Sequence, residues 1–145
     1  MSPWPDLPDG ASVRVGCDIV TLAEVEHSVA EFGDRYLRKV FAEEEIRDCV
    51  GANRIARLAS RFAAKEAVIK VFGAPDAAFP LPEIVVTQSG AVPALHLTGS
   101  VARLAREHGW IESSLSLSHA DCHAMAVVAV ACRRPSRPGV TPSGT

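Results

Sequence analysis

The chain has 145 residues, of which 48% are hydrophobic and 22% are charged, and its formal net charge is −2. Such a length and composition are typical of one globular domain with a single core. The slight acidic excess argues against a protein that binds nucleic acid or a membrane surface, because such binders usually carry a clear basic excess. The N-terminus lacks the features of a secretion signal, and the apolar run 124–131 is too short to cross a bilayer. We therefore expect a cytoplasmic protein.

The first regular element is predicted to be a strand over residues 13–20, because apolar and other residues alternate there. We expect one face of it to lie in the core, formed by Val13, Val15, Cys17 and Ile19. Asp18 stands on the opposite face. Its carboxylate either points at a ligand, with the small Gly16 leaving room beside it, or simply ends the strand. Residues 1–12 contain three prolines and are expected to form an irregular arm before the domain.

The middle of the chain is predicted to be helical, with helices over residues 22–32, 35–40 and 42–50. A longer helix is predicted over 55–72, because this segment is rich in good helix formers and contains neither Gly nor Pro. Gly73 is expected to end it. An apolar stripe of this helix should face the core, formed by Ile55, Leu58, Phe62 and Ile69.

The long helix also carries two polar pairs at a spacing of four residues, Arg61 with Lys65 and Glu66 with Lys70. A carboxylate and several cations on one rigid helix suit a site for a metal-bound phosphate. Spacing alone favours the simpler interpretation of solvated ion pairs on the helix surface, where each contributes roughly 0.2–0.5 kcal/mol. A basic stripe on this helix is either a solvated face or a surface for an anion or a partner; its members are Arg54, Arg57, Arg61 and Lys65.

The second half of the chain contains most of the predicted strands. Its expected elements are a hairpin of strands 83–87 and 94–98, a helix over 99–108, strands over 114–118 and 123–132, and a disordered tail over 133–145. His119, Asp121 and His123 alternate as metal ligands can, but they fall in the predicted turn between two strands, where alternation fails. A metal site at that turn is therefore disfavoured.

Three segments together resemble one family: residues 15–20 (VGCDIV), 61–70 (RFAAKEAVIK) and 116–119 (SLSH). In this order and spacing they resemble the holo-acyl-carrier-protein synthases, the small 4′-phosphopantetheinyl transferases. The similarity covers about residues 13–132, and its central segment is the specific one. The resemblance implies one domain with an α+β fold, in which the long helix packs across an antiparallel sheet.

The resemblance implies an enzyme that transfers 4′-phosphopantetheine from coenzyme A to a serine of an apo acyl or peptidyl carrier protein, releasing adenosine 3′,5′-bisphosphate. Asp18 and Glu66 match the family's Mg²⁺ carboxylates, and two protein ligands suffice because Mg²⁺ usually keeps several waters. Lys70 matches a catalytic lysine that either neutralises the transferred phosphoryl group or assists proton movement. The residues implied to line the coenzyme A site are Arg61, Lys65, Lys70, Gly73, Ser118 and His119. A homotrimer with coenzyme A between subunits is also implied, in which His119 serves a neighbouring subunit.

Two departures from the family pattern concern the substrates. A glycine-rich loop usually follows the long helix, whereas Gly73 is followed here by Ala-Pro-Asp-Ala-Ala. The helix over 22–32, which in the family typically presents arginines to an acidic carrier, carries no Lys or Arg but has Glu24, Glu26 and Glu31. Repulsion there would exclude a standard acidic fatty-acid carrier and favour a specialised one, as in polyketide metabolism. Docking on basic residues elsewhere is the alternative, on Arg35, Arg38 and Lys39 or on the basic stripe.

A competing hypothesis is a non-catalytic relative that binds coenzyme A or a carrier as an assembly subunit. The altered loop and the acidic helix favour it, whereas the intact Asp18, Glu66 and Lys70 oppose it. A different Mg²⁺-nucleotide binder is disfavoured, because the sequence contains neither a P-loop nor a GxGxxG motif.

Overall fold

The computed structural model describes residues 9–73, 78–88, 90 and 92–133. Its elements are β1 (Ala11–Thr21), α1 (Leu22–Phe32), α2 (Asp34–Val40), α3 (Glu43–Asp48), α4 (Arg54–Phe72), the short 3₁₀ helix η1 (Leu81–Glu83), β2 (Ile84–Thr87), β3 (Ala94–Leu97), α5 (Gly99–Glu107), β4 (Trp110–His119) and β5 (His123–Arg133). Each predicted helix and strand is present, and β4 begins four residues earlier than expected. Most of the predicted arm and tail, and the loop directly after Gly73, lie outside the described residues.

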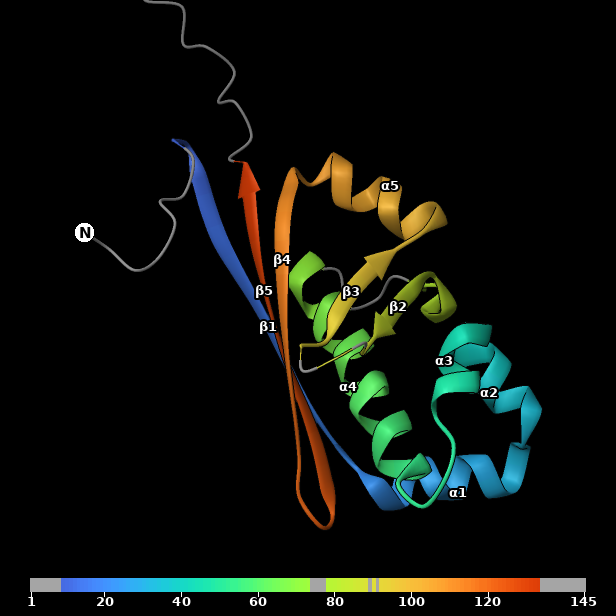
Figure 1. Cartoon of the computed structure of the whole chain (residues 1–145). Coiled ribbons are helices and arrows are strands. Elements are labelled where there is room, and N and C mark those ends of the chain that lie inside the picture. The colour runs from blue at the N-terminus through green and yellow to red at the C-terminus, as the bar shows by residue number, and fades with distance from the viewer. Residues whose placement is uncertain (1–8, 74–77, 89, 91, 134–145) are drawn as a thin grey trace, which may run out of the picture.

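A three-stranded antiparallel sheet of order β1-β5-β4 forms one layer of the molecule, and α4 packs across one of its faces (Figure 1). The β2–β3 hairpin, α5 and the α1–α3 helices lie on the same side of the sheet as α4 (Figure 1). The predicted α+β class and the long helix crossing an antiparallel sheet are therefore confirmed. No described helix is long and apolar enough to cross a membrane.

Local sequence signals set the helix ends that border the site. Thr21 Oγ1 accepts a hydrogen bond of 3.2 Å from the Glu24 N–H, so Thr21 caps the first turn of α1. Gly73 ends α4 with a φ of 68°, in the left-handed region that glycine adopts without a Cβ penalty. Because Thr21 is both the last residue of β1 and the cap of α1, the helix begins directly after the strand that carries Asp18.

The buried face of α4 consists mainly of small residues. Ala63, Ala64 and Ala67 are completely buried against the sheet, together with the larger Leu58 and Val68. The predicted stripe is only partly correct, because Ile55, Phe62 and Ile69 are partly buried at the margin of the core. Alanines at the contact allow the helix backbone to approach the strands more closely than a stripe of large residues would.

The face of β1 that enters the core is the opposite of the predicted one. Gly16 and Val20 are buried beneath the helices, whereas Val13, Val15 and Ile19 are 53%, 61% and 62% exposed. Cys17 is also exposed, which corrects its assignment to the core. Alternation with period two shows which residues share a face but not which face the helices cover.

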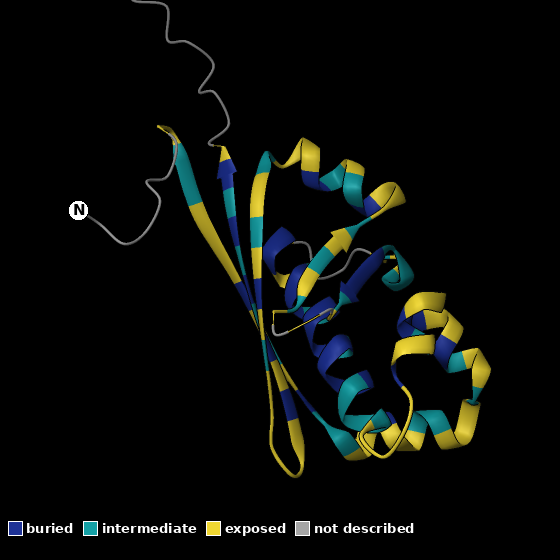
Figure 2. Ribbon diagram, viewed as in Figure 1, coloured by how far each residue is buried: buried dark blue, intermediate teal, exposed yellow. Residues whose placement is uncertain are grey.

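The uncovered side of the sheet, which we call the outer face, is largely apolar in the single chain. The exposed residues of β1 are paired with exposed or partly buried residues of β5: Val13 with Ala131, Val15 with Ala129, Cys17 with Val127 and Ile19 with Met125. Figure 2 shows exposed and partly buried residues alternating with buried ones along these strands. The fold thus leaves one apolar sheet face without a covering element among the described residues.

Candidate active site

The end of β1 and the second half of α4 bring the three predicted catalytic residues together. Lys70 Nζ donates hydrogen bonds of 2.9 Å to Asp18 Oδ1 and of 2.9 Å to the Cys17 carbonyl oxygen. The Asp18 side chain is 16% exposed and that of Lys70 is 57% exposed, so the pair lies at the edge of the core. Glu66 is half-buried one helical turn before Lys70. Lys70 bonds Asp18, although spacing alone favoured a bond to Glu66.

The electrostatics of this cluster suit a bound cation. Burial raises the pKa of the Glu66 carboxyl, and the charge of Asp18 raises it further, while Lys70 opposes them. The hydrogen bond to Asp18 raises the pKa of Lys70 against the opposing effect of desolvation. Asp18 and Glu66 repel each other despite the nearby ammonium group of Lys70, and a divalent cation between them would relieve this repulsion.

The donor set of the cluster fits Mg²⁺. This ion typically takes one or two carboxylates and fills its remaining positions with water and substrate phosphate oxygens. No group of three or more His, Cys, Asp or Glu side chains in the described part of the chain could hold a metal ion, so an all-protein cage is not formed there. Asp18 and Glu66 could supply two of the ligands of such an ion.

Lys65 occupies a different environment from the predicted one. Its side chain is completely buried, and its Nζ lies 2.7 Å from Glu45 Oε1 and also donates to the carbonyl oxygens of Leu81 and Ile84. The prediction that Lys65 contacts coenzyme A is corrected, because the side chain has no surface open to a ligand. The alanines that surround Lys65 in the sequence are the signal that could have indicated its burial.

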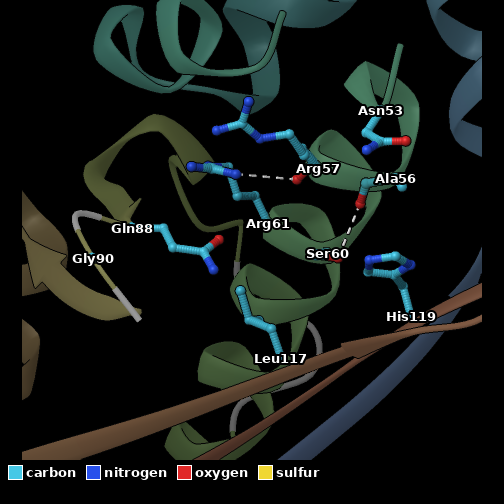
Figure 3. A pocket seen from close by; sticks show the side chains of 9 residues that line it. All are labelled: Asn53, Ala56, Arg57, Ser60, Arg61, Gln88, Gly90, Leu117 and His119. Atoms are coloured by element: carbon cyan, nitrogen blue, oxygen red, sulfur yellow. Dashed lines mark hydrogen bonds between the residues drawn. The ribbon is translucent and has the colours of Figure 1, made fainter. Parts of the chain in front are cut away.

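A pocket of about 520 Å³ opens beside the first half of α4 (Figure 3). Figure 3 shows cationic side chains from α4 on its wall, Gln88 from the end of β2, and His119 from the end of β4. The lining residues are Asn53, Ala56, Arg57, Ser60, Arg61, Gln88, Gly90, Leu117 and His119. Sequence analysis named Arg57, Arg61 and His119 but missed Gln88, because only the packing of the hairpin against α4 brings it there.

Arg61 is almost completely buried in the wall of this pocket, with an exposed fraction of 1%. Its Nε donates to the Val86 carbonyl oxygen at 3.3 Å and its Nη1 to the Arg57 carbonyl oxygen at 3.4 Å. Its Nη2 is buried without a hydrogen-bond partner among the described residues. The buried Nη2 has no open surface for a ligand, but the positive charge of the guanidinium group at the pocket wall favours an anion in the pocket.

The sheet order separates the pocket from the carboxylates. Asp18 lies on one edge strand, β1, whereas His119 lies on the other, β4, and two strand spacings amount to roughly 10 Å. Glu66 and Arg61 are five residues apart on α4, which turns their side chains roughly 140° from each other around the helix axis. The two clusters therefore belong to opposite edges of one subunit.

The remaining predicted residues lie apart from both clusters. Ser118 is exposed on β4 and is paired with Met125 of the outer face. Gly73 is exposed at the end of α4, where Arg14 Nη2 lies 3.5 Å from the place that a Cβ would take. Neither residue lines the pocket.

Comparison with known proteins defines the class. The profile of the 4′-phosphopantetheinyl transferase superfamily matches residues 14–128, so the chain belongs to that superfamily and is a 4′-phosphopantetheinyl transferase. The chain is also 37% identical over 118 residues to a holo-[acyl-carrier-protein] synthase from Desulfovibrio desulfuricans, which covers 80% of this chain and 94% of the relative. A synthase from Thermus thermophilus is 37% identical over 122 residues, covering 83% and 94%. The chain is thus a member of the holo-acyl-carrier-protein synthase family.

Solved structures agree with this assignment. The structure of an ACPS–CoA complex from Chronobacterium ammoniagenes superposes with a TM-score of 0.75 at 30% identity, covering 85% of this chain and 99% of the other. The holo-[acyl-carrier-protein] synthase of Helicobacter pylori in complex with coenzyme A superposes with a TM-score of 0.69 at 28% identity, covering 80% and 98%. The predicted family is therefore confirmed.

Proposed function

We propose that this enzyme transfers the 4′-phosphopantetheine group of coenzyme A to a serine hydroxyl of an apo acyl or peptidyl carrier protein and releases adenosine 3′,5′-bisphosphate. The observation that carries the proposal is the cluster of Asp18, Glu66 and Lys70 in a chain whose relatives are holo-acyl-carrier-protein synthases. Two structural neighbours were solved with coenzyme A, which supports that substrate. A cytoplasmic location stays a prediction from the sequence.

In this proposal Asp18 and Glu66 hold Mg²⁺. The bound ion would orient the pyrophosphate of coenzyme A and offset charge on the leaving phosphate. The serine oxygen of the carrier forms a bond to the β-phosphorus as the bond from that phosphorus to the adenosine bisphosphate breaks, and the hydroxyl proton passes to a neighbouring carboxylate or to water. The hydrogen bond to Asp18 raises the pKa of Lys70 and keeps its ammonium group charged at neutral pH. This favours electrostatic neutralisation of the transferred group by Lys70 over proton acceptance.

We further propose that the pocket of Arg57, Arg61 and His119 binds a phosphate of coenzyme A. Arg57 is partly exposed and His119 is exposed in this pocket, so both can contact a ligand, and the buried positive charge of Arg61 adds to the attraction of an anion. Because this pocket and the carboxylates lie at opposite sheet edges, one subunit would supply the carboxylates and its neighbour the pocket. Such a head-to-tail contact can close into a ring, and the family resemblance implies three copies.

The apolar outer face supports this assembly. Soluble monomers rarely expose a large contiguous apolar patch, and Val13, Val15 and Ile19 are each more than half exposed in the single chain. Their neighbours on β5 are apolar as well. A homotrimer that buries the outer face would remove this surface from water and bring the two edges of different subunits together.

The carrier is the finer part of the proposal. Exposed carboxylates line α1, which begins directly after the strand that carries Asp18, at Glu24, Glu26 and Glu31. We propose that their charge excludes a standard acidic fatty-acid carrier and that the enzyme serves a specialised one, as in polyketide metabolism. The exposed Arg35, Arg38 and Lys39 of α2 offer the alternative docking surface, and only a carrier panel separates the two.

Intact-mass spectrometry of several apo carriers of graded acidity, incubated with the enzyme, coenzyme A and Mg²⁺, tests the activity. We expect one carrier to gain one phosphopantetheine mass, and we expect EDTA or Glu66→Gln to abolish this gain. Glu44→Gln, which neutralises an exposed carboxylate of α3, should leave the gain intact. If no carrier gains mass while coenzyme A still raises the unfolding temperature, the protein is instead a non-catalytic assembly subunit.

Mixing two inactive variants tests the shared site. Glu66→Gln removes the carboxylate half, and Arg57→Glu with His119→Ala removes the pocket half. If the halves come from different subunits, co-refolded mixtures contain some interfaces with both halves intact and regain activity. Mixtures that stay inactive, although the subunits exchange, would place both halves in one subunit.

A further inference from the structure

Gly16 lies where β1 and α4 are in close contact. A Cβ on this residue would overlap the carbonyl oxygen of Ala67, and it would also lie 2.9 Å from Val71 Cγ2 and 3.0 Å from the Ala67 carbonyl carbon. Gly16 does not have a positive φ, so space rather than backbone conformation requires glycine here.

The obstruction at Gly16 is backbone, which cannot adapt as a side chain does. A side chain can change its rotamer, whereas the Ala67 carbonyl belongs to the interior of α4 and is held by the helix. The buried alanines one turn earlier on α4, Ala63 and Ala64, already let the helix lie close to the sheet. A larger residue at position 16 therefore has to move β1 and α4 apart.

The same contact lies within the catalytic cluster. Gly16 precedes Asp18 by two residues and so shares its strand face, and Ala67 directly follows Glu66. Lys70 donates to the carbonyl oxygen of Cys17, the residue between Gly16 and Asp18. Any separation of β1 from α4 at Gly16 is thus transmitted to the gap between the two carboxylates.

We propose that Gly16 is a positioning residue, whose missing side chain holds β1 against α4 at the separation at which one divalent cation spans Asp18 and Glu66. This inference rests on the proposed metal role of the two carboxylates. Gly16 touches neither metal nor substrate in this account. Its effect passes through the position of Asp18.

Gly16→Ala in the full-length chain is the first test, with Mn²⁺ binding measured by electron paramagnetic resonance in the presence of coenzyme A. We expect the affinity for Mn²⁺ to fall by about 10- to 100-fold, as for residues that orient metal ligands. The turnover number should fall with it, while the KM for coenzyme A changes much less. The Mn²⁺ readout does not depend on catalysis.

A second substitution distinguishes positioning from plain destabilisation. Asp18→Glu adds one methylene group, so it should weaken Mn²⁺ binding in the wild-type background but restore part of it in the Gly16→Ala background, where the gap is wider. Val130→Ala, which creates a cavity at a completely buried residue of β5, is the matched stability control and should leave the Mn²⁺ affinity unchanged. If Gly16→Ala alone does not fold, Val71→Ala in the same chain removes the side-chain part of the overlap and leaves the backbone part.

The outcomes separate the two proposals. Wild-type protein that binds no Mn²⁺ overturns the metal role of Asp18 and Glu66 and the positioning role with it. Wild-type binding together with unchanged binding in Gly16→Ala overturns the positioning role alone. The positioning role also fails if Asp18→Glu weakens binding equally in both backgrounds.

Discussion

Lys65 Nζ and Glu45 Oε1 lie 2.7 Å apart with both side chains fully excluded from solvent. Glu45 also accepts hydrogen bonds from the backbone N–H groups of Ala42 and Val86, so the pair joins α4, α3 and β2. Burial lowers the pKa of Lys65, and the charge of Glu45 opposes this shift. The ammonium group thus depends on its partner to remain charged in the core.

Removing one partner of this pair should be strongly destabilising. Lys65→Met leaves an uncompensated carboxylate in the core, and the expected loss in the free energy of unfolding is about 3–5 kcal/mol. The double variant Lys65→Met with Glu45→Leu should lose less than the sum of the two single variants, because it buries no unpaired charge. Urea unfolding measures both. Additive losses would show that the two residues do not depend on each other.

The raised pKa of Glu66 predicts that this residue opposes folding at neutral pH. Its ordinary value is 4.5, and the folded-state value lies above it. The protonated Glu66 is therefore tolerated in the folded state below that ordinary value. The free energy of unfolding then falls as the pH rises through the folded-state pKa, because the charged carboxylate is disfavoured there. Glu66→Gln should raise the unfolding temperature of the metal-free protein at neutral pH while abolishing transfer. At about pH 4 this increase in unfolding temperature should vanish, because Glu66 of the wild type is then largely protonated and as neutral as the glutamine that replaces it. A gain that is the same at both pH values would contradict the assignment.

The outer face predicts the oligomeric state. If the proposed trimer forms through the outer face, Val15→Lys combined with Ile19→Lys places two charges in its interface and should give monomers. Val92→Lys is the control, because Val92 is 73% exposed but lies between β2 and β3, away from the outer face. Light scattering after size-exclusion chromatography gives the mass. An unchanged mass in the double variant would mean that another surface forms the assembly.

The pocket predicts a substrate-binding effect without an effect on the chemical step. Arg57→Ala should raise the KM for coenzyme A by about tenfold, the size of one lost charge-assisted hydrogen bond, and should change the turnover number little. Added salt should reduce the difference in KM between the wild type and Arg57→Ala, because screening weakens the attraction between Arg57 and the phosphate in the wild type. Arg106→Ala on the exposed side of α5 is the matched control. A lowered turnover number with an unchanged KM would contradict phosphate binding in this pocket.

The acidic helix predicts carrier choice. Glu24→Arg should increase the rate with an acidic fatty-acid carrier and decrease it with the preferred carrier, because the substitution reverses the local charge. Arg35→Glu tests the alternative surface on α2 and should change the rate of transfer only if carriers dock there. Competition between two apo carriers, followed by mass spectrometry, measures the preference directly. An unchanged rate in Glu24→Arg would end the exclusion hypothesis.

Much of the secondary structure could be predicted because its signals are local. The capping threonine before α1 and the glycine after α4 act within one helical turn, and the hairpin of β2 and β3 follows from two short strands around a turn. The family segments also predicted that Asp18, Glu66 and Lys70 belong to one site, and the structure brings them together. This was possible because a motif is recognised from the types of its residues and their order along the chain.

Contacts between distant segments could not be predicted in this way. Spacing alone suggested that Arg61 and Lys65 formed a surface pair, but Lys65 is bound to Glu45, twenty positions away, and Arg61 enters a pocket wall. Alternation in β1 identified two faces, yet the helices cover the one with Gly16 and Asp18 and leave the apolar one exposed. Solvent exposure depends on how the layers pack, and the sequence of one strand does not show which of its faces another layer will cover.

The helices and strands, their order and the candidate catalytic residues follow from residue type and from spacings of a few positions, so they could be predicted from the chain alone. Only the tertiary structure decided which face of the sheet lies open, which cations are sealed in the core, and how close Gly16 allows β1 to come to α4. Those outcomes depend on how layers pack together, and packing is set jointly by residues far apart in the chain.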